Sequence, residues 1–250
     1  MQQRLKAALL AAMLSMASAQ AGAQARYDSP NAAADALVTA VASGDEDGLR
    51  RILGPDFRRF VPQDSIARED VYAFLAAWHD HSEVAQTAPD RATLLVGRQD
   101  WSFPVPLVKR AGGWRFDLRE GVVEMRSRRI ERNEAAAIET LQMLCAAQDR
   151  YRAAFGRPAA RIVSREGTTD GLYWDADAAA QASPLGEEAL VMTPDTPAAE
   201  AWHGYHFAAR PQMGDDGCAF RAWPATRGQT GARSFGIGAD RQVSEVANAK

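Results

Sequence analysis

A long amphipathic pattern in the middle of the chain constrains the fold more than any other feature. Residues 121–155 have the pattern of a helix, in which mainly apolar residues at helical spacing mark one side. Gly156 and Pro158 follow as helix-ending residues. The stripe consists of Ile138, Leu141, Leu144, Cys145, Gln148, Tyr151 and Phe155. A helix with a single apolar stripe needs another layer to cover it. The pattern therefore predicts a long helix laid on a sheet.

Strand patterns that can supply this sheet follow the helix, at residues 205–209, 219–223, 234–237 and 242–246. Short turns at 214–217 and 238–240 separate some of them, which favours antiparallel pairing. Between the helix and these strands, residues 156–201 are rich in Pro, Gly and Ala and have weak periodicity. We expect an irregular insert there, of the kind that is often functional or mobile.

The first half of the chain predicts helices followed by another antiparallel sheet. A helix starts at Ser29-Pro30-Asn31, a turn at Ser43-Gly44-Asp45 ends it, and a second helix follows. A further helix is marked by Val71, Phe74, Leu75 and Trp78, and strands by residues 92–96, 103–108 and 114–118. The fold class is therefore α+β, with an N-terminal domain over residues 26–119 and a second domain over residues 120–250.

Residues 1–25 are typical of a secretory signal peptide. Arg4 and Lys6 precede an apolar run over residues 7–19, which is too short to span a bilayer. Ala23-Gln24-Ala25 fits the small-x-small cleavage pattern, so we expect Arg26 as the first mature residue; 17–19 and 21–23 are competing sites. The expected location is the periplasm, with no membrane span after the signal.

The chain has two cysteines, Cys145 and Cys218. In an oxidising compartment they can form a disulfide, whereas Cys145 can also be a small apolar residue of the core. The formal charge is −3, which predicts no attraction to nucleic acid. Neither a C-x-x-C pair nor a G-x-S-x-G elbow occurs in the sequence.

Other residue types that carry chemistry show no catalytic, cofactor-binding or metal-binding arrangement. The four histidines are His79, His81, His203 and His206, and no spacing among them resembles a zinc site. Acidic clusters at 45–47, 187–188 and 215–216 stand in turn-like contexts, where carboxylates are usually solvated. Arg126, Arg128, Arg129 and Arg132 are interleaved with acids, so a solvated helix face is expected.

The segment from Trp101 to Pro106 is locally unusual because it combines aromatic residues with two prolines. Pro104 and Pro106 predict an edge or bulged strand, and Trp101 and Phe103 share one side of an extended chain. These two residues are either part of a core strand or a partner or ligand surface. His203 and Tyr205, near the start of a later strand, are further contact candidates.

Several segments taken in order resemble a family of exported bacterial proteins, domain-of-unknown-function family 2950. The likeness extends over residues 31–243 and is carried by these pieces: ALV 36–38, GD 44–45, GPD 54–56, DWSFPVPLVK 100–109, GWRFD 113–117, RIERNE 129–134, DGLYW 170–174, SPLG 183–186 and HGY 203–205. The resemblance implies export and no established activity. The chain ends soon after Val243, where the family leads us to expect further residues.

Two fold-level likenesses accompany this resemblance. The first half is similar to the nuclear-transport-factor-two-like cone, and the second half to a pilin or pseudopilin head without its apolar N-terminal spine. Our first hypothesis is a non-catalytic envelope protein that binds a partner or assists assembly. The alternative is a small-ligand-binding protein or hydrolase with a pocket in the N-terminal domain, lined by His79 or His81 and a buried carboxylate.

Overall fold

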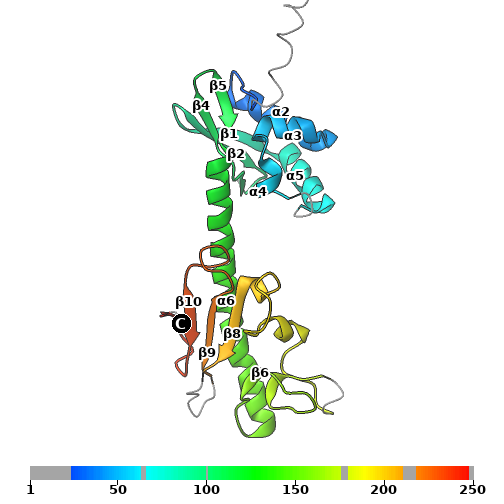
Figure 1. The fold of residues 1–250 in the computed structure, drawn as a ribbon, viewed down its shortest axis with the longest axis vertical. Helices are drawn as coiled ribbons and strands as arrows, with labels where there is room; N and C mark the ends of the chain where they lie inside the picture. Colours follow the sequence, from blue (N-terminus) through cyan, green and yellow to red (C-terminus); the bar gives the residue numbers. More distant parts are fainter. Residues whose placement is uncertain (1–23, 63–65, 100, 176–179, 211–217, 248–250) are drawn as a thin grey trace, which may run out of the picture. The chain divides into compact units, whose positions relative to one another are not determined.

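The structure is a computed structural model and describes residues 24–62, 66–99, 101–175, 180–210 and 218–247. The chain divides into two compact units, Met1–Met125 and Arg126–Lys250, each with helices and an antiparallel sheet (Figure 1). The predicted α+β class is confirmed. Most of the predicted signal peptide, residues 1–23, lies outside the described part of the chain. Among the described helices, none is both long and apolar enough to cross a bilayer.

Four helices open the first unit: α2 (Pro30–Ser43), α3 (Glu46–Leu53), α4 (Phe57–Phe60) and α5 (Arg68–Asp80). The Ser29 hydroxyl caps α2 by accepting the Ala32 amide at 3.1 Å. Gly44 ends α2 with a left-handed φ of 64°, and the Asp45 carboxylate caps α3 by accepting the Gly48 amide at 2.8 Å. The predicted turn between these helices is therefore present, and its residue types explain it.

The first sheet has five strands, β1 (Ser82–Ala88), β2 (Arg91–Val96), β3 (Trp101–Ser102), β4 (Leu107–Arg110) and β5 (Gly113–Phe116). They pair in the order β1-β2-β4-β5, and β3 pairs with β2. The strand predicted at 103–108 is interrupted, because Pro104 and Pro106 have no N–H to donate and only its end joins β4. Strand β1 was not predicted, since its sequence SEVAQTA has few large apolar residues.

Side chains fill the interior between the helices and the sheet of the first unit. Ala33, Ala34 and Leu37 of α2 are almost completely buried, as are Leu94, Leu107 and Phe116 of the sheet. The two alanines bring the α2 backbone close to the sheet, and the larger residues occupy the remaining space. The interior between the helices and the sheet is therefore a packed core rather than a ligand pocket.

Residues 24–27 form part of the first unit. The amide of Tyr27 donates to the Trp114 carbonyl at 2.8 Å, and the Trp114 amide donates back at 2.7 Å. Ala25 and Gln24 also donate hydrogen bonds to the folded unit. The segment thus extends along β5, although the sequence places the end of the signal peptide at residue 25.

The second unit is built around helix α6 (Leu118–Phe155), which begins in the first unit. Its sheet follows the antiparallel order β11-β10-β9-β8 (Figure 1). The strands are β8 (Tyr205–Ala209), β9 (Phe220–Pro224), β10 (Ser234–Ile237) and β11 (Val243–Val246). Leu141, Leu144 and Tyr151 of the predicted stripe are fully buried in one core with Phe207 and Phe220 of the sheet. The unit boundary falls inside α6, later than the predicted 119/120 boundary, because Leu118 and Val122 pack into the first core.

The predicted irregular insert contains short regular elements. Strands β6 (Arg161–Val163) and β7 (Gly171–Tyr173) form a parallel pair, and the 3₁₀ turn η3 (Glu187–Val191) follows; η4 (Trp202–Gly204) comes directly after the insert. Several of its large apolar residues belong to the second core: Leu172, Trp174, Leu185 and Met192. These residues recur at no fixed spacing, so periodicity could not identify the insert as a packed layer.

Candidate functional site

Four aromatic side chains of the first unit form a row of ring contacts, which we call the aromatic surface: Trp101, Phe103, Phe74 and Trp78. The ring centroids of Trp101 and Phe103 are 6.2 Å apart, and Phe103 and Phe74 are 6.3 Å apart. Phe103 also contacts the buried ring of Phe116 at 5.9 Å. The row therefore extends from the core to Trp101, whose side chain remains 49% exposed.

Local structure explains why this row is open to solvent. Trp101 lies on the short strand β3, opposite Val96 of β2, and the proline segment that follows separates β3 from β4. Helix α5 carries Phe74 and Trp78, yet it has no fully buried residue along its whole described length. This helix covers the sheet incompletely, and of the two predicted contact residues Trp101 is exposed and Phe103 is half-buried.

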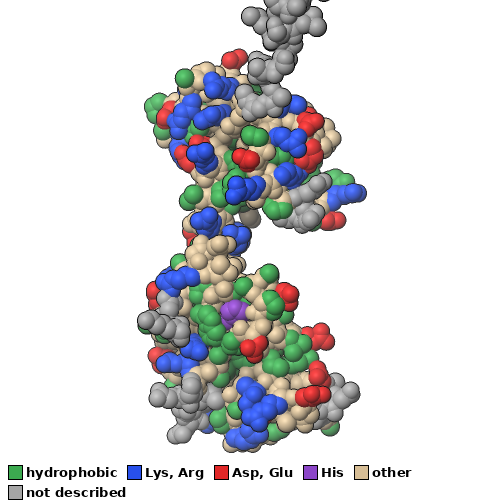
Figure 2. All heavy atoms as spheres, in the orientation of Figure 1, with side chains coloured by type: hydrophobic (Ala, Val, Ile, Leu, Met, Phe, Trp, Pro, Cys, Tyr) green, Lys and Arg blue, Asp and Glu red, His purple; other side chains and the backbone are tan. Residues whose placement is uncertain are grey.

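The charged groups beside the aromatic surface neutralise each other. Arg98, in the turn before Trp101, donates to Asp80 at the end of α5 through Nε at 2.8 Å and Nη2 at 2.9 Å. Such a bidentate pair leaves little net charge next to the rings. On the face seen in Figure 2, each unit mixes basic, acidic and hydrophobic side chains. This ion pair therefore adds no net charge on the side of the aromatic surface where Arg98 and Asp80 lie.

A cleft of about 360 Å³ lies elsewhere in the first unit, between α2, α3 and the N-terminal segment. Its polar lining includes Tyr27, Asp35, Thr39, Ser43, Asp45 and Arg51. The Thr39 hydroxyl donates to the Asp35 carbonyl at 2.7 Å, and the Ser43 hydroxyl donates to the Thr39 carbonyl at 2.8 Å. Burial raises the pKa of the Tyr27 phenol, which the Arg51 charge opposes in part. No hydroxyl in this lining is paired with a base, so the cleft suits binding rather than nucleophilic attack.

His79 and His81 do not line this cleft, and both are exposed. The pocket expected around either of them with a buried carboxylate is therefore not this cleft. Over the described ranges no group of three or more His, Cys, Asp or Glu is placed to hold a metal ion.

In the second unit, a buried carboxylate fastens α6 to the turn before β10, in an arrangement we call the Glu134 clamp. Glu134 is 4% exposed and accepts the amides of Ala232 at 2.9 Å and Arg233 at 3.1 Å. It also accepts the Arg233 guanidinium Nε at 2.7 Å. Asn133 donates to the Thr230 carbonyl at 2.8 Å. Burial acts to raise the Glu134 pKa, but these hydrogen bonds outweigh it and hold the pKa below its usual range.

Sequence reasoning missed the clamp, because Glu134 appeared only as one acid within a basic run. The available signal was its position one helical turn before Ile138, on the side of the apolar stripe. Every charge of the clamp is paired within the protein, so its geometry supports a structural role.

The other two predicted contact residues, His203 and Tyr205, differ in burial. Tyr205 is completely buried, and its hydroxyl donates to the Arg233 carbonyl at 2.8 Å. Burial, followed by the nearby Glu134 charge, raises its pKa far above the usual range. Tyr205 is therefore a core residue and not a contact, because strand β8 turns this side chain toward α6 and the clamp. His203 remains exposed, with a φ of 49° and its ring 4.5 Å from that of Trp202.

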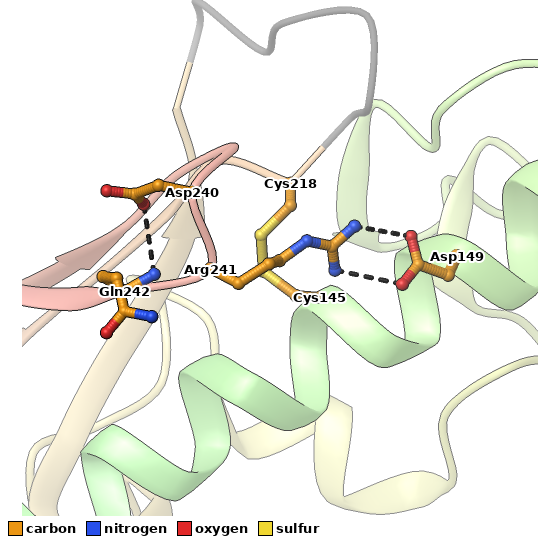
Figure 3. The surroundings of a disulfide bond; sticks show 6 residues. All are labelled: Cys145, Asp149, Cys218, Asp240, Arg241 and Gln242. Atoms are coloured by element: carbon orange, nitrogen blue, oxygen red, sulfur yellow. Dashed lines mark hydrogen bonds and ion pairs between the residues drawn. A yellow bond between two sulfur atoms is a disulfide. The ribbon is translucent and has the colours of Figure 1, made fainter.

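The structure joins Cys145 of α6 and Cys218 before β9 in a disulfide, with their Cα atoms 5.1 Å apart (Figure 3). The bond is buried, with Cys145 2% and Cys218 1% exposed. Arg241 passes beside it and makes a bidentate ion pair with Asp149, through Nη2 at 2.7 Å and Nη1 at 3.0 Å. The disulfide connects the helix to the segment before β9, and the ion pair connects it to the turn between β10 and β11, so both have a structural role.

Comparison with known proteins adds a family and no relative of known activity. The family model described as Protein of unknown function (DUF2950) matches residues 24–247. No curated protein and no solved structure matches the chain. The family resemblance seen in the sequence is confirmed, whereas the likenesses to the cone and to a pilin head stay predictions.

Proposed function

The chain belongs to the DUF2950 family, and from this premise we propose that it is an exported, non-catalytic module that binds an envelope partner through the aromatic surface of its first unit. The occupant we expect is an extended, uncharged, apolar segment of another protein. The observation that carries the proposal is Trp101, half exposed at the end of a row of rings anchored in the core.

The physical case rests on how such a site binds. Trp is the residue type most often responsible for binding energy at protein interfaces, and a ring held by packed neighbours loses little entropy on contact. Phe103 supports Trp101 from the core side. The paired charges of Asp80 and Arg98 leave a neutral border. An apolar segment would cover the exposed ring without leaving a buried charge unpaired.

Export is supported by the signal-like first residues and by the second unit. A buried disulfide between two distant segments is typical of proteins that fold in an oxidising compartment. A protein of the periplasm meets no nucleic acid, in agreement with its mildly negative charge.

Site-specific photo-crosslinking in intact cells tests the binding proposal. A crosslinking residue at position 101 is compared with one at position 190, because Leu190 is also 49% exposed but lies in the second unit. We expect a single envelope protein to crosslink at position 101 and not at position 190.

The crosslinked segment, made as a synthetic peptide, then gives an affinity. Replacing Trp101→Ala should weaken peptide binding by about tenfold or more, and Leu190→Ala should leave it unchanged. Equal crosslinking at both positions, or a peptide that binds Trp101→Ala as well as wild type, would contradict the proposal.

The cleft between α2 and α3 supports a second candidate, a small-ligand-binding protein. Its volume of about 360 Å³ is in the range of small-molecule sites. Arg51, which pairs with Asp45 at 3.4 Å, is the basic group of a lining that also contains Asp35, and it is the group that an anion would contact. Calorimetry with citrate and with phosphate tests this candidate. Binding that Arg51→Ala abolishes and Arg50→Ala preserves would favour it; Arg50 is a matched control because it pairs with Asp47 outside the cleft lining. If the heats measured with citrate and phosphate equal the heats of dilution, the cleft does not bind these anions.

A further inference from the structure

The N-terminal segment is attached to the first unit through its side chains as well as its backbone. The Gln24 side-chain amide donates to the Ile52 carbonyl at 2.9 Å and to the Phe116 carbonyl at 2.7 Å. The Ala25 amide donates to the Arg51 carbonyl at 2.7 Å. One glutamine side chain thus connects the end of α3 with the end of β5, and uses both of its N–H groups to do so.

The surrounding structure is shaped to receive this segment. Gly113 of β5 has a φ of 125°, and a Cβ at this position would lie 2.6 Å from the Tyr27 carbonyl oxygen. Any larger residue there would push the segment away from β5. The Arg26 guanidinium reaches the Ala111 carbonyl at 2.9 Å across the same turn. The contacts of residues 24–27 therefore belong to the fold, and they include residues 24 and 25, which precede Arg26.

The sequence offers three cleavage positions, after Ala19, Ala23 and Ala25, and the last two lie directly beside the folded segment. The triplets Ala23-Gln24-Ala25 and Ala21-Gly22-Ala23 both place small residues at the two positions that signal peptidase reads. A cut after Ala25 would remove all three hydrogen bonds donated by Gln24 and Ala25. It would leave the Ile52 and Phe116 carbonyls without this donor. A cut after Ala23 keeps every one of these bonds.

We infer that the exported chain is cleaved between Ala23 and Gln24, so that the mature protein begins with Gln24 as a structural residue of the first unit. The inference rests on the proposed export and changes the start expected from the sequence, Arg26. The new N-terminal residue would tie α3 to β5 as soon as the first unit folds.

Matched variants of the mature chain test the structural part of the inference. Chains that begin at Gln24 and at Arg26 are prepared by cleavage of a removable fusion. The shorter chain should lose about 1 M in the urea midpoint of the first unit and should exchange the Trp114 amide faster. In the longer chain, Gln24→Glu should cause a similar loss, because it replaces the donor by an acceptor that faces two carbonyls. Gln99→Glu, at an exposed position of the same unit, is the control and should change little.

The start itself is measured on the full-length chain, expressed with its own first residues and recovered from separated cell fractions. Intact mass and N-terminal sequencing should show Gln24 first in protein from outside the cytoplasm. Exported protein that begins at Arg26 or Gln20 would overturn the inference and leave the proposed export standing. Protein that keeps Met1 and stays in the cytoplasm would overturn the proposed export as well. Equal stability of the two mature chains would also count against the inference.

Discussion

The two units attach helices to a sheet in different ways. In the first unit, α2 and α5 lie against the sheet through side-chain packing, and α5 has no fully buried residue. In the second unit, α6 is joined to the sheet region by the Cys145–Cys218 disulfide, the buried Glu134 clamp and the Arg241–Asp149 ion pair. Both cysteines of the chain lie in this unit. The comparison indicates that covalent and charged links hold the helix of the second unit in place, whereas the first unit keeps an aromatic surface partly open to solvent.

Removal of the disulfide should have the largest effect and should affect only the second unit. The variant Cys145→Ala/Cys218→Ala opens a loop with a sequence separation of 73 residues. The chain-entropy relation gives a loss of about 4 kcal/mol in the free energy of unfolding. Hydrogen exchange resolved by peptide measures both units in one experiment. An equal loss of protection in both units would show that they unfold together and would break the comparison.

Removal of the buried carboxylate should rank next. Glu134→Ala leaves the amides of Ala232 and Arg233 without their acceptor, so we expect the second unit to lose about 3 kcal/mol. Glu139→Ala is the matched control, since Glu139 is exposed on the same helix and its loss should cost less than about 0.5 kcal/mol. Urea titration of both variants measures the two losses in the free energy of unfolding. Similar midpoints would mean that the clamp contributes little.

In the first unit, replacing Phe103 should destabilise the fold more than replacing Trp101. Phe103→Ala removes a half-buried ring that touches Phe116, and we expect a loss of about 2 kcal/mol in the stability of this unit. Trp101→Ala should cost about 1 kcal/mol or less, because half of this side chain is already in water. Thermal unfolding compares the pair. A larger destabilisation by Trp101→Ala would assign Trp101 to the core and weaken the case for a binding surface.

The smallest expected effect is a pH dependence confined to the acid side. The pKa of Glu134 is lower in the folded chain than its usual value, about 4.3. Its stabilisation is therefore complete above about pH 5 and is lost as the pH falls through the folded pKa. Asp170 adds a dependence of the same sign: burial acts to raise its pKa, but hydrogen bonds from the Arg165 amide and the Thr168 hydroxyl lower it. Glu134→Gln should flatten the acid slope of the second unit without removing it. An unchanged slope would contradict the role of Glu134.

Sequence reasoning found the elements that repeat or that end in residues with strong backbone preferences. The stripe of α6 appears because a helix returns the same face to the core every three or four residues. The start of α2 and the turn between α2 and α3 appear because Ser29, Gly44 and Asp45 act on their immediate neighbours. The sequence also singled out Trp101 and Phe103, because Pro104 and Pro106 restrict strand pairing within a few residues.

What only the tertiary structure decided depends on residues far apart in the chain. Glu134 meets Arg233, and Gln24 meets Phe116, across long sequence separations. The face on which Cys218 lies, and the inward turn of Tyr205, depend on strand register and on what covers each face. The sequence by itself therefore determined the fold class and the main elements, since these follow from local periodicity. Packing determined which polar side chains became structural and which aromatic one stayed exposed, since burial is a property of the assembled fold.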